Sequence, residues 1–210
     1  MQPSNGDASL SRAAQISRHE IRALIAALRD VGLWSPQLDG PFPDSAAVEN
    51  LIEPVLADPA RLAAVRDTGR SVGRDPELDR MAMLAALALG TPFGAVTMIF
   101  DDCQTLAGGY LGGAPISDCT PLEQSLCKFA VASGEPFFVE DARLNPLTVD
   151  NPLVRDGQVA AYAGVPLLDD GNQAVGALAC WDTKPRFWTS GHVQVLTELG
   201  GVVRKKIFND

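Results

Sequence analysis

The chain has 210 residues, of which 46% are hydrophobic, and it carries a formal net charge of −9 at neutral pH. This length and composition are those of a globular protein that can bury a hydrophobic core without cross-links. The acidic excess would repel nucleic-acid phosphates and anionic membrane surfaces, so neither is expected as a partner. No apolar run reaches the roughly 18 residues of a membrane span, and the N-terminus lacks the apolar core of a signal peptide. We therefore expect a cytoplasmic protein.

Composition divides the chain into three parts. Residues 1–16 are small and polar and predict a disordered tail. A capping box over residues 17–20 and apolar residues at three- and four-residue spacing predict helices within residues 17–58, interrupted by a Pro- and Gly-rich segment over 34–43. We interpret residues 17–58 as an N-terminal helical extension and residues 59–210 as the main domain.

The main domain starts with helices and continues as strands mixed with helices. Apolar runs rich in β-branched and aromatic residues predict strands, and apolar residues of helical period predict helices. The predicted strands are 95–100, 104–111, 137–139, 159–168 and 174–182, and the predicted helices are 60–67, 76–89, 121–133 and 190–208. The Asn- and Pro-rich residues 141–157 predict a long loop, and such loops often carry function. This order favours an antiparallel sheet covered by helices, an α+β domain.

Polar side chains of the long loop are candidates for contact with a ligand. They are Asp141, Arg143, Asn145 and Asn151. Asn-Pro sequences also satisfy their own backbone in turns, so a turn-forming role is the alternative. Tyr162, in the next predicted strand, could stack on or hydrogen-bond to a bound molecule, or place its ring in the core with the hydroxyl at solvent. We expect the hairpin over 159–182 to build the sheet, and the preceding loop to supply most of the recognition.

The four cysteines show no CxxC motif and no Cys/His spacing of a metal site. Reduced thiols are the default in a cytoplasmic protein. Cys127 lies in an apolar helical pattern and Cys180 in an apolar strand, so both are predicted to be small core residues rather than a redox couple. Cys103 and Cys119 lie in or beside loops and are expected to be more accessible, with no resolving partner apparent for either.

Four blocks of the sequence resemble a known family. They are RLAAVRDTG, DPELDRMAMLAALALGTPFGAVTMIFDDCQ, SLCKFAVASGEPFFVEDARLNPLTVDNPLV and YAGVPLLDDGNQAVGALACWDTKPRFWT. In this order and spacing they look like the GAF domains of bacterial signalling proteins, over about residues 61–208. The resemblance implies a central antiparallel sheet of about six strands, with helices on one face and a ligand pocket on the other. It also implies that residues 121–133 and 141–157 roof the pocket, which adds Cys127 and Phe129 to the candidate ligand-binding residues.

Two departures from the family's pattern bear on the ligand. Where relatives often carry an acidic residue, Arg and Gln after the first strand, this chain has Asp102-Cys103-Gln104. Where relatives often carry Cys-x-His in the following helix, this chain has Cys127-Lys128-Phe129. Both changes remove polar or cationic groups from places where relatives present them, so a ligand that relatives hold with those groups is not expected here.

Cofactors and common catalytic motifs are not expected. His19 and His192 lie in the first turns of predicted helices and are expected to be solvated, which disfavours haem and metal binding. The cysteine motifs of bilin-binding relatives and the motif of cyclic-nucleotide-binding relatives are not recognisable. The sequence also lacks a P-loop, a nucleophile elbow and zinc-site spacing.

Two functions from different classes follow. The first is a non-enzymatic sensory or regulatory module that binds a small molecule or a partner protein and signals through its flanking helices. Apolar stripes on the first and last predicted helices predict a homodimer. The sequence ends just after the last helix, so a standalone protein would act through a separate signalling partner, whereas a piece of a longer protein would not need one. The alternative is a redox enzyme of the free methionine sulfoxide reductase type, with Cys127 and Cys180 as its thiols; we predict the sensory module.

Overall fold

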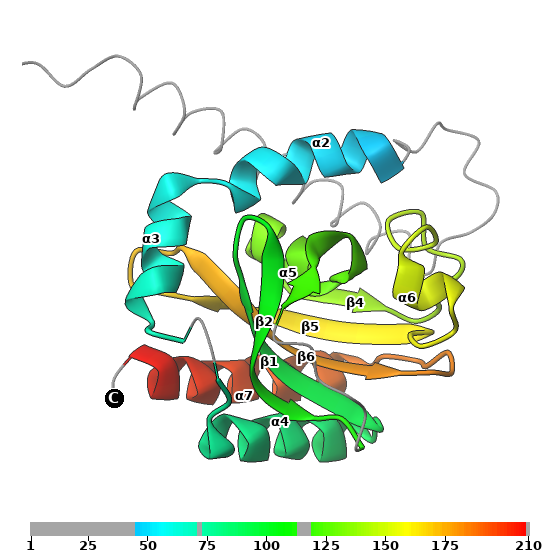
Figure 1. Cartoon of the computed structure of the whole chain (residues 1–210). Helices are drawn as coiled ribbons and strands as arrows, with labels where there is room; N and C mark the ends of the chain where they lie inside the picture. Colours follow the sequence, from blue (N-terminus) through cyan, green and yellow to red (C-terminus); the bar gives the residue numbers. More distant parts are fainter. Residues whose placement is uncertain (1–44, 71–72, 113–118, 209–210) are drawn as a thin grey trace, which may run out of the picture.

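The computed structural model describes residues 45–70, 73–112 and 119–208, which form a six-stranded sheet with helices on both faces (Figure 1). The helices are α2 (Ser45–Leu56), α3 (Pro59–Asp67), α4 (Pro76–Leu89), the 3-10 helix η1 (Leu122–Gln124), α5 (Cys127–Ser133), α6 (Pro152–Arg155) and α7 (Ser190–Phe208). The strands are β1 (Phe93–Ile99), β2 (Cys103–Tyr110), β3 (Thr120–Pro121), β4 (Phe137–Val139), β5 (Ala161–Leu168) and β6 (Ala174–Asp182). The predicted tail over 1–16 and the predicted first helix lie outside the described residues.

The strands are arranged in the order β3-β2-β1-β6-β5-β4, and every neighbouring pair is antiparallel. This confirms the predicted α+β class and the sheet of about six strands. The β5–β6 hairpin turns at residues 169–172, where Asn172 adopts a left-handed conformation with φ of 62°. The hairpin is central to the sheet, because β6 also pairs with β1.

Helix α4 begins and ends where the sequence predicted. The Asp75 carboxylate accepts a hydrogen bond from the Glu77 amide, Pro76 occupies the first turn, and Gly90 ends the helix with φ of 67°. The predicted helix over 121–133 is wrong in its first half. Residues 120–121 form β3, and Ser125 has an extended backbone with ψ of 122°, which separates η1 from α5.

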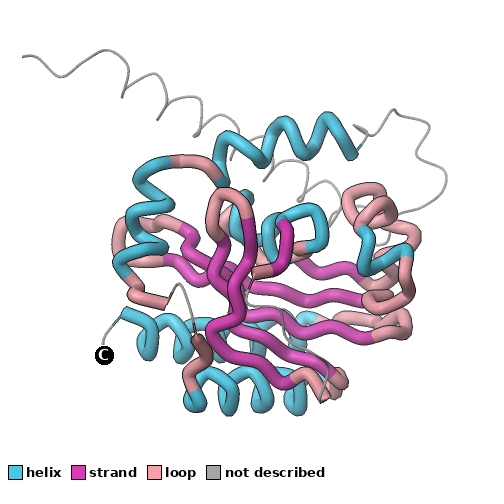
Figure 2. The backbone as a smooth tube through the Cα atoms, viewed as in Figure 1, coloured by secondary structure: helices cyan, strands magenta, loops and turns pink. Residues whose placement is uncertain are grey.

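The sheet separates two hydrophobic cores. Helices α4 and α7 cover one face, drawn below the sheet in Figure 1, and α5 and α2 lie on the other side. Figure 2 shows the strands twisting between these two layers of helices. Side chains alternate between the faces along each strand: Val96 and Leu178 point to the α4 and α7 side, whereas Ala177 and Ala179 point to the α5 side.

Arg61 joins the N-terminal helices to the sheet. Its guanidinium is fully buried, donating from Nη1 to the Ile99 carbonyl at 2.7 Å and to the Ala174 carbonyl at 3.3 Å. Its Nε donates to the Leu56 carbonyl at 3.0 Å, at the end of α2. Apolar residues of α2 also pack into the core beside α5, so α2 is integrated with the main domain rather than held only by its chain connection.

Cys103 and Cys119 form a disulfide, with a Cα–Cα separation of 5.7 Å. The expectation of reduced thiols, with no partner for these two residues, is therefore wrong. The physical reason is the short strand β3, which the sequence pattern did not reveal: β3 pairs with β2 so that Cys103 lies opposite Pro121, and this brings Cys119 to the end of β2. Cys127 and Cys180 are free and buried, as predicted.

In the part of the chain that the structure describes, no helix combines the length and apolar character needed to cross a membrane.

Candidate functional site

A cavity of about 430 Å³ lies on the face of the sheet opposite α4 and α7. We call it the sheet-face cavity. Its lining residues are Phe93, Ala95, Thr97, Gln104, Leu106, Leu111, Thr120, Gln124, Ser125, Leu126, Cys127, Leu153, Gln158, Val159, Tyr162, Ala179, Trp181 and Thr183. Five strands, β1, β2, β3, β5 and β6, supply lining residues, and the segments around η1 and α6 supply the roof. The volume is within the range of small-molecule sites in proteins.

Small side chains on one face of the central strands create the space. Ala95 of β1 lies opposite Ala179 of β6, so two neighbouring floor positions carry only a methyl group. The next position across the sheet, Gly164 of β5, lies under the Tyr162 ring. The adjacent positions that face α4 and α7 carry larger side chains, such as Val96 and Leu178. The large side chains fill the space on the α4 and α7 face, whereas the small ones leave a cavity on the opposite face.

Aromatic side chains border this floor at one end. Phe93, Trp181 and Tyr162 occupy consecutive positions across β1, β6 and β5, and all three line the cavity. The Phe93 and Trp181 rings are stacked, with centroids 5.4 Å apart and planes inclined by 20°. The Tyr162 ring also contacts Phe137, with a centroid separation of 5.9 Å. Such a row of rings offers a large apolar contact surface to a bound molecule.

The hydroxyl of Tyr162 is buried and makes no hydrogen bond to an oxygen or nitrogen atom of the described residues; its polar neighbour is the Cys127 thiol. It therefore does not reach solvent, which the sequence had left open as one of its roles. Burial raises the pKa of Tyr162 well above its usual value, so the phenol stays neutral. Buried hydroxyls without an oxygen or nitrogen partner are uncommon in proteins, and this one adjoins the cavity.

The two free thiols lie on opposite faces of the sheet. Cys127 lines the sheet-face cavity, whereas Cys180 belongs to the core beneath α4 and α7. Burial raises the pKa of the Cys127 thiol, although the neighbouring Thr97 and Tyr162 hydroxyls oppose this, and burial raises the pKa of Cys180 to about 12. Both thiols are therefore protonated near neutral pH, and the sheet prevents them from forming a couple.

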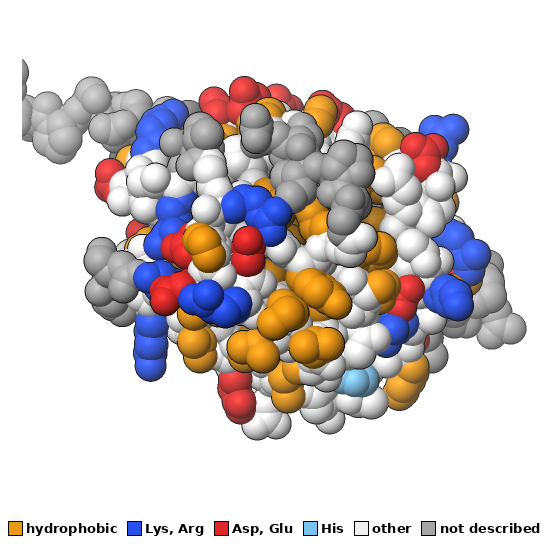
Figure 3. Space-filling model, turned by 60° about the horizontal axis from the view of Figure 1, so that its bottom comes forward, with side chains coloured by type: hydrophobic (Ala, Val, Ile, Leu, Met, Phe, Trp, Pro, Cys, Tyr) orange, Lys and Arg blue, Asp and Glu red, His pale blue; other side chains and the backbone are white. Residues whose placement is uncertain are grey.

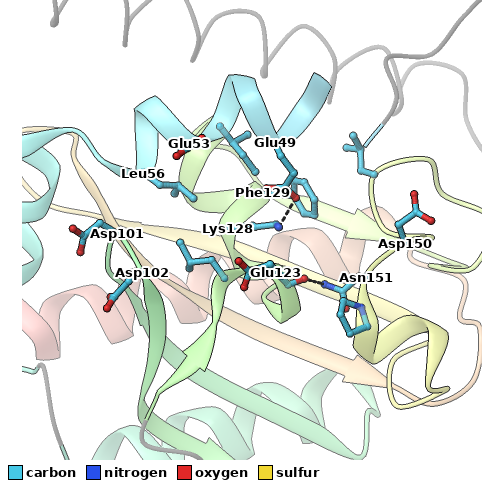
Figure 4. Close-up of a pocket in the computed structure, with 14 residues that line it drawn as sticks. Glu49, Glu53, Leu56, Asp101, Asp102, Glu123, Lys128, Phe129, Asp150 and Asn151 are labelled. Carbon is cyan, nitrogen blue, oxygen red and sulfur yellow. Dashed lines mark hydrogen bonds and ion pairs between the residues drawn. The ribbon is translucent and has the colours of Figure 1, made fainter. Parts of the chain in front are cut away.

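A second cavity, of about 720 Å³, lies between α2 and the segments of η1, α5 and α6 (Figure 4). We call it the α2 cavity. Acidic residues dominate its lining, namely Glu49, Glu53, Asp101, Asp102, Glu123 and Asp150. The buried Lys128 ammonium pairs with the Glu49 carboxylate at 2.5 Å and lies 5.4 Å from the Phe129 ring centroid. Among the described residues, no group of three or more His, Cys, Asp or Glu side chains is arranged to hold a metal ion.

The predicted site residues are distributed over three places. Cys127 and Tyr162 line the sheet-face cavity, and Phe129 and Asn151 line the α2 cavity. Asp141, Arg143 and Asn145 line neither cavity.

The polar residues of the long loop make local contacts. The Arg143 guanidinium donates to the Asp141 carboxylate at 2.6 Å, and this hydrogen bond lowers the pKa of Asp141. The Asn145 side chain accepts from the Leu147 amide at 2.9 Å. Asn151 caps α6, accepting from the Leu153 amide and donating from Nδ2 to the Glu123 carbonyl at 2.9 Å (Figure 4). These contacts fit the turn-forming alternative, and ligand contact by these residues stays a prediction.

The β5–β6 hairpin contributes more to the cavity than the sequence indicated. It builds the centre of the sheet, as predicted, and also supplies Tyr162, Ala179, Trp181 and the following Thr183 to the lining. The loop over 141–157 supplies only Leu153. The sequence contained a signal for this role. Residues 177–181 read ALACW, so the alternate positions 177, 179 and 181, which share one face of the strand, carry Ala, Ala and Trp.

Comparisons with known proteins agree with this architecture. A family model described as the GAF domain matches residues 76–204, more than half of the chain. A cyclic di-GMP phosphodiesterase of Pseudomonas aeruginosa is 37% identical over 115 residues, which are 54% of this chain and 19% of that protein. The chain thus spans about a fifth of the length of this curated relative.

Solved structures share the fold at low sequence identity. The GAF domain of an Acinetobacter phosphoenolpyruvate-protein phosphotransferase superposes with a TM-score of 0.53 and 15% identity, covering 71% of this chain and 94% of that one. A free methionine-R-sulfoxide reductase of Neisseria meningitidis, solved with its substrate, superposes with a TM-score of 0.52 and 20% identity, covering 82% and 96%. Both similarities concern the fold.

Proposed function

Because this chain belongs to the GAF domain family, we propose that it is a non-enzymatic sensory module whose sheet-face cavity binds a small molecule. The observation that carries this proposal is the cavity itself: about 430 Å³ of space over a floor formed by Ala95 and Ala179, bordered by three aromatic rings. The Tyr162 hydroxyl beside it gives further support, since its polar neighbour is a thiol, a weak hydrogen-bonding group, whereas buried hydroxyls are normally paired.

The thiols support a binding role rather than catalysis. A reductase of the free methionine sulfoxide type, working through two cysteines, needs a reactive thiolate and a second cysteine to resolve it. Cys127 is protonated through burial, and Cys180 lies across the sheet from it. No observation favours redox chemistry at Cys127, so we do not propose it.

Strand β5 offers a route from the cavity to the surface helices. Tyr162 lines the cavity, while Val165, three residues further along β5, contacts α7 closely enough that a β-carbon at Gly200 would lie 2.8 Å from its Cγ2. A ligand that shifts β5 would therefore press on α7. This contact supports signalling through the last helix.

Native mass spectrometry of gently purified protein tests small-molecule binding. We expect a discrete extra mass on the wild type that is absent from Ala95→Leu, because the larger side chain fills the cavity floor. Ala88→Leu, at an exposed position of α4, is the matched control and should keep the extra mass. An extra mass that persists in Ala95→Leu would place the ligand elsewhere.

We further propose that the face formed by α4 and α7 mediates a homodimer. Figure 3 shows hydrophobic side chains gathered on this face. The large exposed apolar residues of the two helices are Leu84 (52% exposed) and Leu87 (60%) on α4, with Val195 (38%) and Val202 (49%) on α7. Apolar surface of this kind on a soluble protein is typical of an interface.

Light scattering coupled to size-exclusion chromatography tests the dimer. We expect a dimeric mass for the wild type and a monomeric mass for Leu87→Glu, because a charge buried in an apolar interface is not compensated. Val149→Glu is the control and should remain dimeric, because Val149 is an exposed residue of the loop before α6 and belongs to neither α4 nor α7. A monomeric wild type would contradict the homodimer and leave the face to a separate signalling partner.

A further inference from the structure

The sheet-face cavity is lined by no charged side chain among the described residues. Its polar groups are hydroxyls and amides, from Thr97, Thr120, Thr183, Ser125 and the three glutamines Gln104, Gln124 and Gln158. Two of its lining residues could ionise, Cys127 and Tyr162, and burial raises the pKa of both, so both are neutral. The part of the lining formed by described residues therefore carries no charge.

A charged ligand would be poorly accommodated in such a site. Moving an ionised group from water into a buried environment is costly unless an opposite charge or several hydrogen bonds compensate it. Part of the hydrogen-bonding capacity of the lining is already in use: Ser125 Oγ donates to Gln104 Oε1 at 2.7 Å, and Thr97 Oγ1 donates to the Ala177 carbonyl at 3.3 Å. The lining therefore selects against carboxylates, phosphates and ammonium groups.

The shape and chemistry of the floor favour a ring compound. Ala95 and Ala179 leave a shallow apolar surface, and the stacked Phe93 and Trp181 rings stand at its end. Rings of a ligand can lie on the methyl groups and contact the aromatic side chains edge-on or face-on. The amides of the lining can pair with a carbonyl, amide or hydroxyl of the ligand without charge on either side.

We propose that the sheet-face cavity takes an uncharged ring compound, which lies on the Ala95 and Ala179 floor and packs against Trp181. This inference rests on the proposed function and narrows it to a class of ligand. The α2 cavity differs from the sheet-face cavity in charge, since six carboxylates and Lys128 line it.

A matched pair of fluorescent probes tests the charge requirement. The probes are 8-anilinonaphthalene-1-sulfonate, an anion, and 8-anilinonaphthalene-1-sulfonamide, which has nearly the same size and no charge. We expect the sulfonamide to bind the wild-type protein at least tenfold more tightly than the sulfonate. Binding of the sulfonamide should be lost in Ala95→Leu and kept in Ala88→Leu, which assigns it to the cavity rather than to the exposed apolar face.

Replacement of an aromatic residue tests the packing. Trp181→Ala should weaken binding of the sulfonamide about tenfold, because aromatic contacts and apolar area are lost. Phe187→Ala removes an aromatic ring that is 70% exposed and outside the cavity lining, and it should leave the affinity unchanged. Equal effects of the two replacements would overturn the predicted position of the ligand.

The outcomes separate the two proposals. Cavity-dependent binding of the sulfonate that equals or exceeds that of the sulfonamide would overturn the uncharged ligand class and leave the binding function standing. If neither probe binds and native mass spectrometry shows no extra mass, the binding function itself fails, and the inference fails with it.

Discussion

The hydroxyl of Tyr162 lies against Gly164, two residues further along β5. A β-carbon on Gly164 would lie 2.3 Å from the Tyr162 hydroxyl oxygen and 2.8 Å from two ring carbons. Both residues face the same side of the sheet, since side chains alternate along a strand. The phenol ring can therefore fold down onto the sheet only because position 164 has no side chain, and this places the ring at the edge of the cavity.

Gly164→Ala should destabilise the protein by about 1 to 3 kcal/mol, because the new methyl group forces the Tyr162 ring out of its position. Urea denaturation followed by circular dichroism measures the change in the free energy of unfolding. Gly201→Ala is the control: Gly201 lies inside α7, and a β-carbon there would meet no atom within 4 Å, so alanine should stabilise the helix by about 0.5 to 1 kcal/mol. Equal stability of Gly164→Ala and wild type would contradict the close contact.

Tyr162→Phe should not reduce the free energy of unfolding and should raise it by up to about 1 kcal/mol in protein without ligand. The change removes a buried hydroxyl whose polar neighbour is the weakly bonding Cys127 thiol, and it keeps the ring. Most tyrosine-to-phenylalanine changes in a core cost stability, so the sign is informative. A loss of more than about 1 kcal/mol by the same denaturation assay would mean that the hydroxyl is paired.

Stability should fall as the pH rises above about 9. Burial raises the pKa of Cys180 to about 12, so the folded state keeps the thiol proton while the unfolded chain loses it near pH 9. A group whose pKa is raised on folding stabilises the fold below its unfolded pKa, and this contribution is lost as the pH rises toward the folded pKa. Cys180 alone accounts for about 1 kcal/mol between pH 9 and 10. In Cys180→Ala the decline over this interval should be smaller by about that amount; an unchanged decline would contradict the raised pKa.

Thiol titration of the denatured protein should find two free thiols without reductant and four after reduction, because Cys103 and Cys119 are joined. Reduction should lower the free energy of unfolding by about 2 to 4 kcal/mol, since the disulfide closes a loop with a sequence separation of 16 residues. Cys103→Ser should match the reduced wild type and show no further response to reductant. Four free thiols in freshly purified protein, handled without reductant, would contradict the disulfide.

The fold was largely predictable from local patterns, because its elements carry strong signals. Pro76 and Gly90 bracket α4 as predicted, and the apolar run that follows the turn residues 169–172 gave the bounds of β6, 174–182, correctly. The features that were not predicted depend on contacts between segments that are distant in the sequence. Strand β3 has only two residues and exists because β2 pairs with it, so no periodicity in the sequence announces it, and the disulfide depends on that pairing.

The candidate site was less predictable than the fold for the same reason. Tyr162 was proposed from its residue type and its place in the strand after the loop, and Cys127 through the resemblance. Phe93 and Trp181, in contrast, become neighbours only when β1 pairs with β6, 88 positions further along the chain. Polar residues of a long loop, such as Asp141 and Arg143, were predicted to contact a ligand because of their type. Their side chains instead satisfy each other. A cavity that exists because Ala95 and Ala179 are small cannot be recognised from residue type alone, since alanine is common in every kind of structure.

Arg61→Met should cost about 3 to 5 kcal/mol, which makes it the most destabilising of these substitutions. The guanidinium is fully buried and donates to the carbonyls of Leu56, Ile99 and Ala174, so it holds the end of α2 against the ends of β1 and β6. Methionine keeps much of the volume and leaves these carbonyls without their donor. Arg66→Met, at an exposed position of α3, is the matched control and should change stability by less than about 0.5 kcal/mol. If the two variants unfold at the same urea concentration, Arg61 does not anchor the N-terminal helices.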